Sequence, residues 1–263
     1  MFKGVLSKMR TELDQSLTYF LELGDDFLIS DYLINKEIRF KFLGFSCLKC
    51  SSKEEIFRQG HCKRCFFESP STAEWVIRPE LSKAHLNIQD RDIDYEKRIQ
   101  LQPHILYLSF TDDVKIGVTR KSQIPTRWID QGAISAIEVA ELPNRYLAGL
   151  CEVELKKYYK DKTNWRAMLK ANKSEIDLNQ EKLNAKKYLP SDLKKYYNST
   201  SLVKEIAYPL ENKLDSPKSI NIKKLKEFKG KLIGIKGQYL IFEDQSVFNV
   251  RSNEGLVVEM ELN

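Results

Sequence analysis

Four cysteines stand in two closely spaced pairs. Two residues separate Cys47 from Cys50, two separate Cys62 from Cys65, and eleven residues lie between the pairs. Two such CxxC turns can bring four thiolates into a tetrahedron around one zinc ion. Because four thiolates complete the coordination shell, no position remains for water, and we expect a structural zinc site rather than a catalytic one. His61, next to Cys62, is interpreted as a loop residue and not as a ligand.

The composition limits the class of protein. Of 263 residues, 42% are hydrophobic and 30% are charged, as in ordinary globular proteins. No apolar run approaches the roughly 18–20 residues that span a bilayer, and the N-terminus lacks an apolar signal-peptide core. We therefore expect a cytoplasmic protein without a membrane partner, whose cysteines bind metal rather than form disulfides. Cys151 is isolated and expected in the core. The oligomeric state stays open.

Positive charge is concentrated in one stretch. Residues 156–231 contain twenty basic and nine acidic side chains. Such an excess favours a polyanion, DNA or RNA, because neutralised phosphates supply most sequence-independent affinity. Lys156, Lys157 and Lys160 are the candidate contacts. A set of solvated helical faces explains the same charges equally simply. Tyrosines and tryptophans between the lysines fit base stacking or amphipathic packing.

Strands dominate the predicted elements before the middle of the chain. Residues 2–9, 17–23 and 36–46 are expected to be strands, and the last of these runs directly into Cys47. Residues 66–100 are charged, without clear periodicity, and are expected to be rich in loops. Two apolar strands, 104–110 and 114–119, flank a short turn and predict an antiparallel hairpin.

Helices and further strands follow the hairpin. Pro125 and Gly132 bracket a short helix over 126–131, the usual placement of both residues. A strand is expected over 133–142 and a helix over 144–160, with Leu147, Cys151, Leu155 and Tyr158 on one side. Residues 172–201 predict exposed helix and loop. Strands are expected over 231–242, 247–250 and 256–260.

These elements predict an α+β protein in three parts. Residues 1–102 form a strand-rich region that carries the four-cysteine zinc knuckle at 47–65. Residues 103–170 form a compact module of strands and helices. Residues 171–263 form a basic helical stretch and a small C-terminal sheet.

The compact module resembles the GIY-YIG nuclease superfamily. Ile105-Leu106-Tyr107 stands at the first motif and Lys115-Ile116-Gly117 at the second, with Arg127 and Glu152 at the positions of the arginine and the glutamate that the superfamily places on its helices. The resemblance covers about residues 103–165 and implies a three-stranded sheet with flanking helices. It also implies cleavage of nucleic-acid phosphodiesters with a divalent metal ion.

The resemblance assigns a role to each residue. Tyr107 would activate or orient water, Arg127 would contact phosphate, and Glu152 would bind Mg²⁺ or Mn²⁺. Gly117 would let a backbone approach closely. Lys115 replaces the tyrosine of the second motif, so it could contact phosphate, while acting as a base would require a strongly lowered pKa.

More of the chain resembles an uncharacterised bacterial zinc-knuckle family with a GIY-YIG-like module. The similarity lies in short segments: residues 47–65, 78–80, 115–120, 127–133, 161–165 and 234–240. No biochemical activity follows from this resemblance. Where that family has further cysteines, this chain offers His85 and His104, which are interpreted as loop and strand-end residues.

Simpler interpretations remain open for the candidate catalytic residues. Tyr107 fits an aromatic strand residue that packs on the sheet, and Arg127 fits an ion pair with a carboxylate such as Asp130. Glu152 fits a solvated helix residue, and periodicity alone does not distinguish it from Glu154.

Three functional hypotheses follow. The first is a metal-dependent, endonuclease-like phosphodiesterase with a structural zinc site. The second is a catalytically inactive protein that binds nucleic acid and retains the GIY-YIG-like fold. The third is a purely structural or protein-interaction role.

Overall fold

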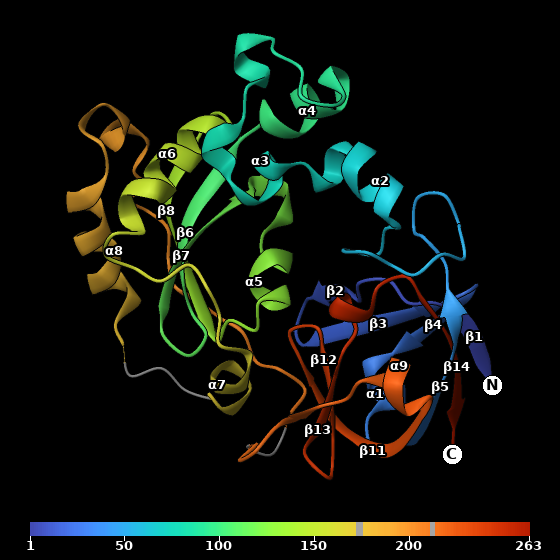
Figure 1. Cartoon of the computed structure of the whole chain (residues 1–263). Helices are drawn as coiled ribbons and strands as arrows, with labels where there is room; N and C mark the ends of the chain where they lie inside the picture. The colour runs from blue at the N-terminus through green and yellow to red at the C-terminus, as the bar shows by residue number, and fades with distance from the viewer. Residues whose placement is uncertain (172–175, 211–213) are drawn as a thin grey trace. The chain divides into compact units, whose positions relative to one another are not determined.

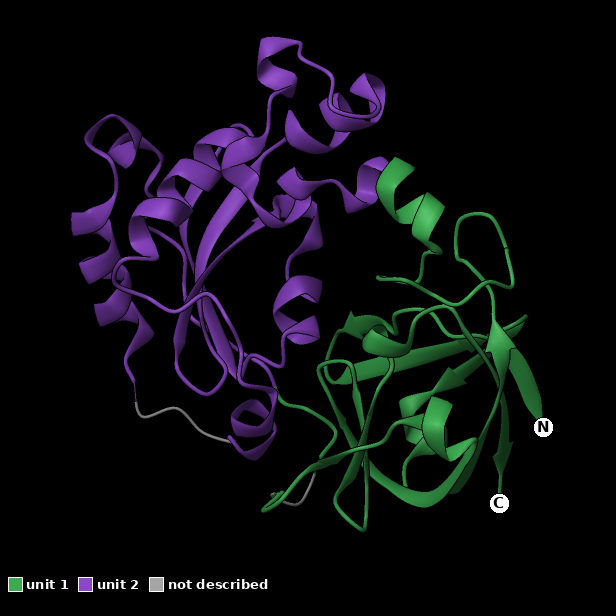
Figure 2. Ribbon diagram, viewed as in Figure 1, with its two compact units in different colours: residues 1–68, 207–263 green, residues 69–206 purple. Residues whose placement is uncertain are grey.

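The computed structural model describes residues 1–171, 176–210 and 214–263. The chain divides into two compact units, which Figure 2 distinguishes: unit 1, residues 1–68 with 207–263, and unit 2, residues 69–206. Both units contain sheets and helices, and the α+β fold class is thus confirmed. Within the described residues, no helix has both the length and the apolar character that a membrane crossing requires.

Unit 1 contains two sheets (Figure 1). The larger consists, in spatial order, of β1 (Phe2–Val5), β14 (Leu256–Leu262), β5 (Glu37–Phe45), β11 (Glu227–Lys236), β12 (Tyr239–Phe242), β13 (Ser246–Asn249) and β10 (Lys218–Ser219). The smaller consists of β2 (Arg10–Leu13), β3 (Leu17–Leu23) and β4 (Asp26–Ile29). Short helices complete the unit: α1 (Ser30–Leu33), α2 (Lys63–Glu68), α9 (Ile222–Leu225) and η6 (Arg251–Asn253).

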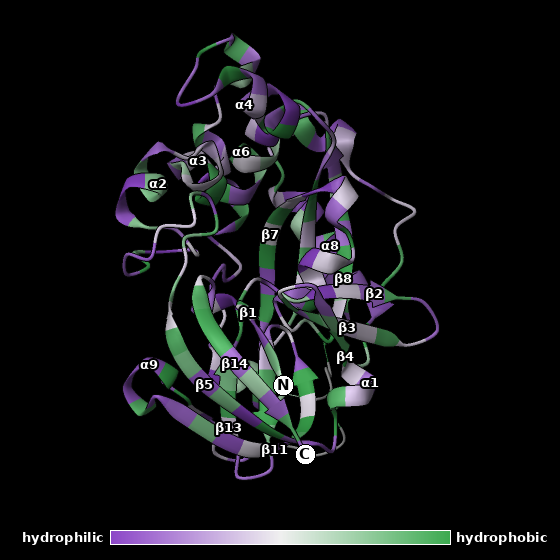
Figure 3. Cartoon of the chain, turned by 90° about the vertical axis from the view of Figure 1, so that its right-hand side faces the viewer, coloured by the Kyte–Doolittle hydropathy of each residue, from purple (hydrophilic) through white to green (hydrophobic). Residues whose placement is uncertain are grey.

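Strand β5 pairs with two strands from the C-terminal part of the chain. It lies antiparallel between β14 and β11, so that Phe40 faces both Met260 and Phe228 in the register. Its period-two pattern buries Ile38 and Phe40, as the predicted strand requires, and the Phe40 ring stacks on Phe248 at 5.3 Å. Figure 3 shows the mixture of hydrophobic and hydrophilic residues along β5 and β14.

The unit boundaries lie elsewhere than the sequence patterns indicate. They fall at residues 68/69 and 206/207, whereas the predicted elements divide the chain after residues 102 and 170. The pairing of β5 with β14 and β11 joins segments far apart in the chain, and no local pattern encodes which distant strands pair.

Unit 2 is built on one antiparallel sheet. Its spatial order is β7 (Val114–Arg120), β6 (His104–Phe110), β8 (Ser135–Leu142) and β9 (Lys204–Glu205). The predicted hairpin and the strand that follows it are confirmed. Helices α6 (Arg145–Leu155) and α8 (Leu178–Tyr188) lie beside the sheet (Figure 1) and pack against the face with Leu106, Leu108 and Ile116. Tyr107 faces the other side, where its ring meets Trp128 of α5 (Thr126–Asp130).

Helices surround this sheet. They are α3 (Glu74–Ile77), α4 (Ile93–Gln100), α5 (Thr126–Asp130), α6 (Arg145–Leu155), α7 (Trp165–Lys170) and α8 (Leu178–Tyr188), with 3₁₀ turns η1 (Pro70–Thr72), η2 (Pro79–Leu81), η3 (Ala84–Leu86), η4 (Lys121–Gln123) and η5 (Ser191–Tyr196). Of the stretch 172–201, residues 172–175 lie outside the described residues.

Helix α6 is shorter than its predicted length. The Asn144 side chain caps its first turn by accepting from the Leu147 amide at 2.9 Å. Cys151 and Leu155 are fully buried, as expected, but the helix ends at Leu155. Tyr158 therefore leaves the packed side and is 53% exposed, contrary to the periodic pattern.

The region expected to be rich in loops contains α3 and α4. Asp92 caps α4 by accepting from the Tyr95 amide at 2.9 Å. The buried Glu96 carboxylate accepts three backbone amides of residues 90–92, at 3.0, 2.7 and 2.9 Å. The buried positions of this helix are the polar residues Glu96 and Gln100 instead of apolar ones, which explains why a search for apolar periodicity missed it.

Candidate functional site

The four cysteines form one cluster in unit 1. Cys47 follows β5, Cys62 directly precedes α2, and Cys65 lies in its first turn, which brings the two CxxC turns together. The four sulfur atoms lie within 4.8 Å of one another. Cys50 Sγ is 3.8 Å from Cys62 Sγ, and a tetrahedron with zinc–sulfur bonds of about 2.3 Å has edges of about 3.8 Å. The cluster could therefore bind zinc.

Backbone groups favour the thiolate form of one cysteine in this cluster, Cys47. The Cys62 amide donates to Cys47 Sγ at 3.3 Å. Burial alone raises the pKa of Cys47, but backbone amides of Cys62, Cys50 and Lys49 outweigh it and lower the pKa to about 6. A thiolate is the form that binds a metal ion. His61 stands outside the cluster, as expected for a loop residue.

A second group of polar residues surrounds Tyr107 in unit 2. Tyr107 is 1% exposed, and its hydroxyl donates to Gln131 Oε1 at 2.7 Å. Burial raises the pKa of Tyr107, the nearby Arg127 guanidinium opposes this, and the Glu152 carboxylate adds to it. Coulombic interactions weaken with distance, so Arg127 and Glu152 lie near enough to Tyr107 to act on its hydroxyl. Tyr107 and these two charged side chains make up the Tyr107 neighbourhood.

Gly117 accommodates the Tyr107 ring. The two residues face each other in the β6–β7 register, and a Cβ on Gly117 would lie 2.6 Å from the Tyr107 hydroxyl oxygen. The side chain of Tyr107 therefore occupies the space above Gly117, where the sequence led us to expect the approach of another backbone.

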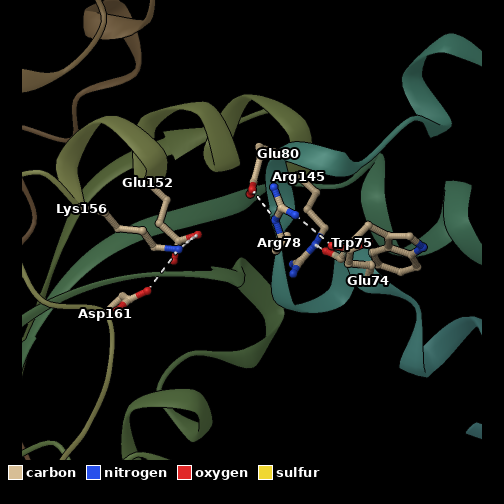
Figure 4. Close-up of polar contacts among 8 residues, drawn as sticks. All are labelled: Glu74, Trp75, Arg78, Glu80, Arg145, Glu152, Lys156 and Asp161. Carbon is tan, nitrogen blue, oxygen red and sulfur yellow. Dashed lines mark hydrogen bonds and ion pairs between the residues drawn. The ribbon is translucent and has the colours of Figure 1, made fainter.

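Glu152 is a buried carboxylate near cations. It is 7% exposed, and burial raises its pKa, although Lys156 and Arg145 oppose this shift. Lys156 Nζ lies 3.4 Å from Glu152 Oε2 and 3.6 Å from Asp161 Oδ2 (Figure 4). Despite this ion pair, Oε2 has no hydrogen-bond partner among the described residues. A solvated helix residue would not be buried in this way, so that alternative does not hold.

Arg145 connects Glu152 to the segment before the sheet. Its Nε donates to the carbonyl oxygen of Trp75 at 3.1 Å (Figure 4), and its Nη2 donates to that of Val76 at 2.6 Å. Burial lowers its pKa to about 10, while the charge of Glu152 opposes the shift. Glu80, which also acts on the pKa of Glu152, is held by Arg78 at 3.0 Å. No sequence pattern pointed to Arg145, whereas Glu80 and Gln131 lie in the segments 78–80 and 127–133 that carry the family resemblance, where neither was given a role.

One glycine signals the contact between α6 and this segment. A Cβ on Gly149 would lie 2.2 Å from the Glu80 amide nitrogen and 2.5 Å from the Pro79 carbonyl carbon. Only glycine lets α6 approach η2 this closely. Gly149 stands in the middle of α6, where glycine is unfavourable unless close packing requires it. Its position in the sequence could therefore have indicated that another segment packs closely against this helix.

Lys115 is engaged in the turn of the hairpin. Its ammonium forms an ion pair with Asp112, in the turn between β6 and β7. Burial lowers the pKa of Lys115, and Asp112 opposes the shift. Lys115 is thus held at the hairpin turn, while Arg127 and Glu152 are the charged side chains that act on the pKa of Tyr107.

The three candidate nucleic-acid lysines are all ion-paired. Besides the two carboxylates near Lys156, Lys157 lies 2.6 Å from Glu154 and Lys160 lies 2.6 Å from Asp113. Each pair cancels much of the charge that a phosphate would meet. This local neutralisation is invisible in a count of basic residues.

The Glu152 neighbourhood offers few ligands for a divalent cation. Apart from the cysteines, no group of three or more histidine, cysteine, aspartate or glutamate residues is placed to hold a metal within the described ranges. Magnesium retains several waters and binds through one or two carboxylates, so Glu152 alone is compatible with it.

Comparison with known proteins identifies a family. A family model described as "Protein of unknown function (DUF2797)" matches residues 35–258. No curated protein and no solved structure matches the chain. The family match begins just before β5, ends within β14 and includes the cysteine cluster as well as the Tyr107 neighbourhood, so this chain belongs to the DUF2797 family.

Proposed function

We propose that unit 2 cleaves nucleic-acid phosphodiesters with a divalent metal ion, and that the cysteine cluster holds a structural zinc ion. The observation that carries the first proposal is that Tyr107 is buried, with the Arg127 guanidinium and the Glu152 carboxylate both acting on its hydroxyl. These are the residue types that the resemblance to GIY-YIG nucleases assigns to water, phosphate and metal. Their chemistry suits a reaction that moves a proton and stabilises negative charge on phosphate.

The residues divide the work as follows. Glu152 would hold Mg²⁺ or Mn²⁺, which supplies charge stabilisation at phosphate and a more acidic bound water. Arg127 would contact a phosphate oxygen. Tyr107 stays neutral near pH 7, because burial raises its pKa, so it would orient a water or a phosphate oxygen by a hydrogen bond now made to Gln131. Tyr107 would therefore not accept the proton of the attacking water, and another base must do so.

The test compares two glutamates on one helix. Glu152→Gln should reduce the rate of Mg²⁺- or Mn²⁺-dependent nicking of DNA or RNA by at least about 100-fold. Glu154→Gln is the matched control, since Glu154 also lies on α6 and pairs with a lysine, Lys157. Equal cleavage by wild type and Glu152→Gln would indicate a contaminant and overturn the assignment.

A second candidate is binding without turnover. Two observations favour it: Tyr107 is buried with its hydroxyl engaged, and Lys115 is engaged by Asp112. This hypothesis predicts salt-sensitive binding of nucleic acid and no cleavage under any divalent cation. Zinc is tested separately, by metal analysis: one zinc per chain is expected, and chelation should release four thiols.

A further inference from the structure

Within the described residues of unit 2, a second group of lysines, without carboxylate partners, lies beyond the predicted contacts. Residues 182–204, from α8 through η5 to β9, contain six lysines and one acidic residue, Asp192. Lys186, Lys187, Lys194 and Lys195 are exposed, and none of them forms an ion pair with a carboxylate of the described residues. Unlike Lys156, Lys157 and Lys160, these four lysines keep their charge available to a partner.

Tyrosine rings accompany these lysines. Lys186 Nζ lies 4.5 Å from the centre of the Tyr197 ring, and Lys195 Nζ lies 5.2 Å from that of Tyr196. Such contacts hold ammonium groups beside aromatic surface. The segment therefore presents positive charge and aromatic faces together, which is the combination that single-stranded nucleic acid requires.

The end of α8 carries a stacked pair of tyrosines. The rings of Tyr158 and Tyr188 lie parallel within 10°, with centres 3.6 Å apart. Tyr188 covers one face of the Tyr158 ring, yet Tyr158 remains 53% exposed, so its other face is open to solvent. An unpaired base could extend this stack, whereas a base inside a duplex already has both faces covered.

We propose that α8, η5 and Tyr158 form a surface that binds single-stranded DNA or RNA. The four exposed lysines contact phosphates, and a base stacks on Tyr158. The inference deepens the proposed function by naming a single-stranded substrate, and it rests on that proposal for the link to cleavage. Binding itself is a separate property and can be measured without turnover.

The experiment uses the full chain carrying Glu152→Gln, without added divalent cation and without chelator, so that any bound zinc stays in place. Fluorescence anisotropy follows binding of oligothymidine and oligouridine of about 20 nucleotides, a length sufficient for common single-strand sites. Replacing Lys186, Lys187, Lys194 and Lys195 by glutamine should weaken affinity at least about tenfold. The slope of log K against log salt should become shallower by about 0.7 for each phosphate that the protein no longer neutralises.

A matched control separates site from net charge. Replacing the exposed unit 1 lysines Lys223, Lys224, Lys226 and Lys229 by glutamine removes the same number of charges. This variant should bind nearly as tightly as the parent. Equal weakening in both quadruple variants would show that only net charge matters and would overturn the proposal.

Stacking and strandedness provide two further readouts. Tyr158→Ala should weaken binding about 5- to 100-fold, as for other stacked aromatic residues, while Tyr158→Phe should bind like the parent. Single-stranded competitor should displace the probe more effectively than duplex or polyglutamate. Equal displacement by duplex, or by polyglutamate, would overturn the single-stranded assignment.

These experiments distinguish the nuclease proposal from the proposal of a single-strand-binding surface. Binding at this surface without cleavage by the chain that retains Glu152 would overturn the nuclease proposal alone. Cleavage that survives the α8 and η5 substitutions with unchanged affinity would overturn the single-strand surface alone.

Discussion

The cysteine cluster and the Tyr107 neighbourhood differ in how they are encoded. All four thiols come from nineteen consecutive positions, residues 47–65, and two tight turns suffice to gather them. The Tyr107 neighbourhood draws on β6, α5, α6 and the segment around Glu80, which are distant in sequence. The first is fixed by local spacing, and the second exists only once unit 2 is folded. The comparison predicts different responses to substitution.

The largest effect is expected at the cysteines. Cys47→Ser removes one of four thiolates, and bound zinc should fall from one per chain to nearly none. Because a structural zinc site contributes folding free energy directly, we expect unit 1 to lose on the order of 5 kcal/mol of stability. Metal analysis and denaturant unfolding measure both quantities. Cys151→Ala is the control, since Cys151 lies in unit 2 and should leave zinc in place. One zinc per chain in Cys47→Ser would contradict a local four-thiolate site.

The next effect probes the buried histidine of unit 2. His104 is fully buried, and burial lowers its pKa from 6.5 to about 4, with Arg145 and Arg120 nearby adding to the shift. Between those values the unfolded chain binds a proton that the folded chain does not. Stability therefore falls as pH drops from 6.5 toward 4, by about 3 kcal/mol in total.

Comparing variants isolates this contribution. His104→Gln should remove the slope of about one proton between pH 4 and 6.5, measured by denaturant unfolding at several pH values. An identical pH profile in wild type and His104→Gln would show that the histidine is protonated in the folded protein.

Packing between distant segments gives a smaller effect. Adding a methyl group at a mid-helix glycine normally stabilises by about 1 kcal/mol. Gly149→Ala should instead destabilise by about 2–3 kcal/mol, since its Cβ would meet the Glu80 backbone at 2.2 Å. Denaturant unfolding measures the difference, with Leu150→Ala, on the exposed side of α6, as the control. A stabilised Gly149→Ala would mean that α6 and η2 move apart at little cost.

These contrasts explain what the sequence could predict. Thiol spacing and the β6–β7 pattern are local, so the cluster and the hairpin were found. Arg145 was missed because its partners are backbone carbonyls of Trp75 and Val76, about seventy positions earlier, which no residue pattern reveals. The end of α6 was misplaced because Tyr158 continues its apolar spacing past the last helical residue.

The smallest effect is expected at the predicted nucleic-acid lysines, and it sharpens the comparison within unit 2. Lys160 Nζ pairs with Asp113 at 2.6 Å, but both side chains are solvent-exposed, and such pairs contribute little to stability. The contact that holds this segment to β7 is the hydrogen bond from the Ile116 amide to the Lys160 carbonyl, at 2.9 Å, which a side-chain substitution leaves intact. Lys160→Met should therefore leave the denaturant midpoint unchanged. Its effect on single-strand affinity should also be smaller than that of Lys186→Met, measured by anisotropy at the same salt concentration. An equal loss in both variants would show that the Asp113 partner does not screen Lys160, and that the sequence count of lysines was the better guide to the binding surface.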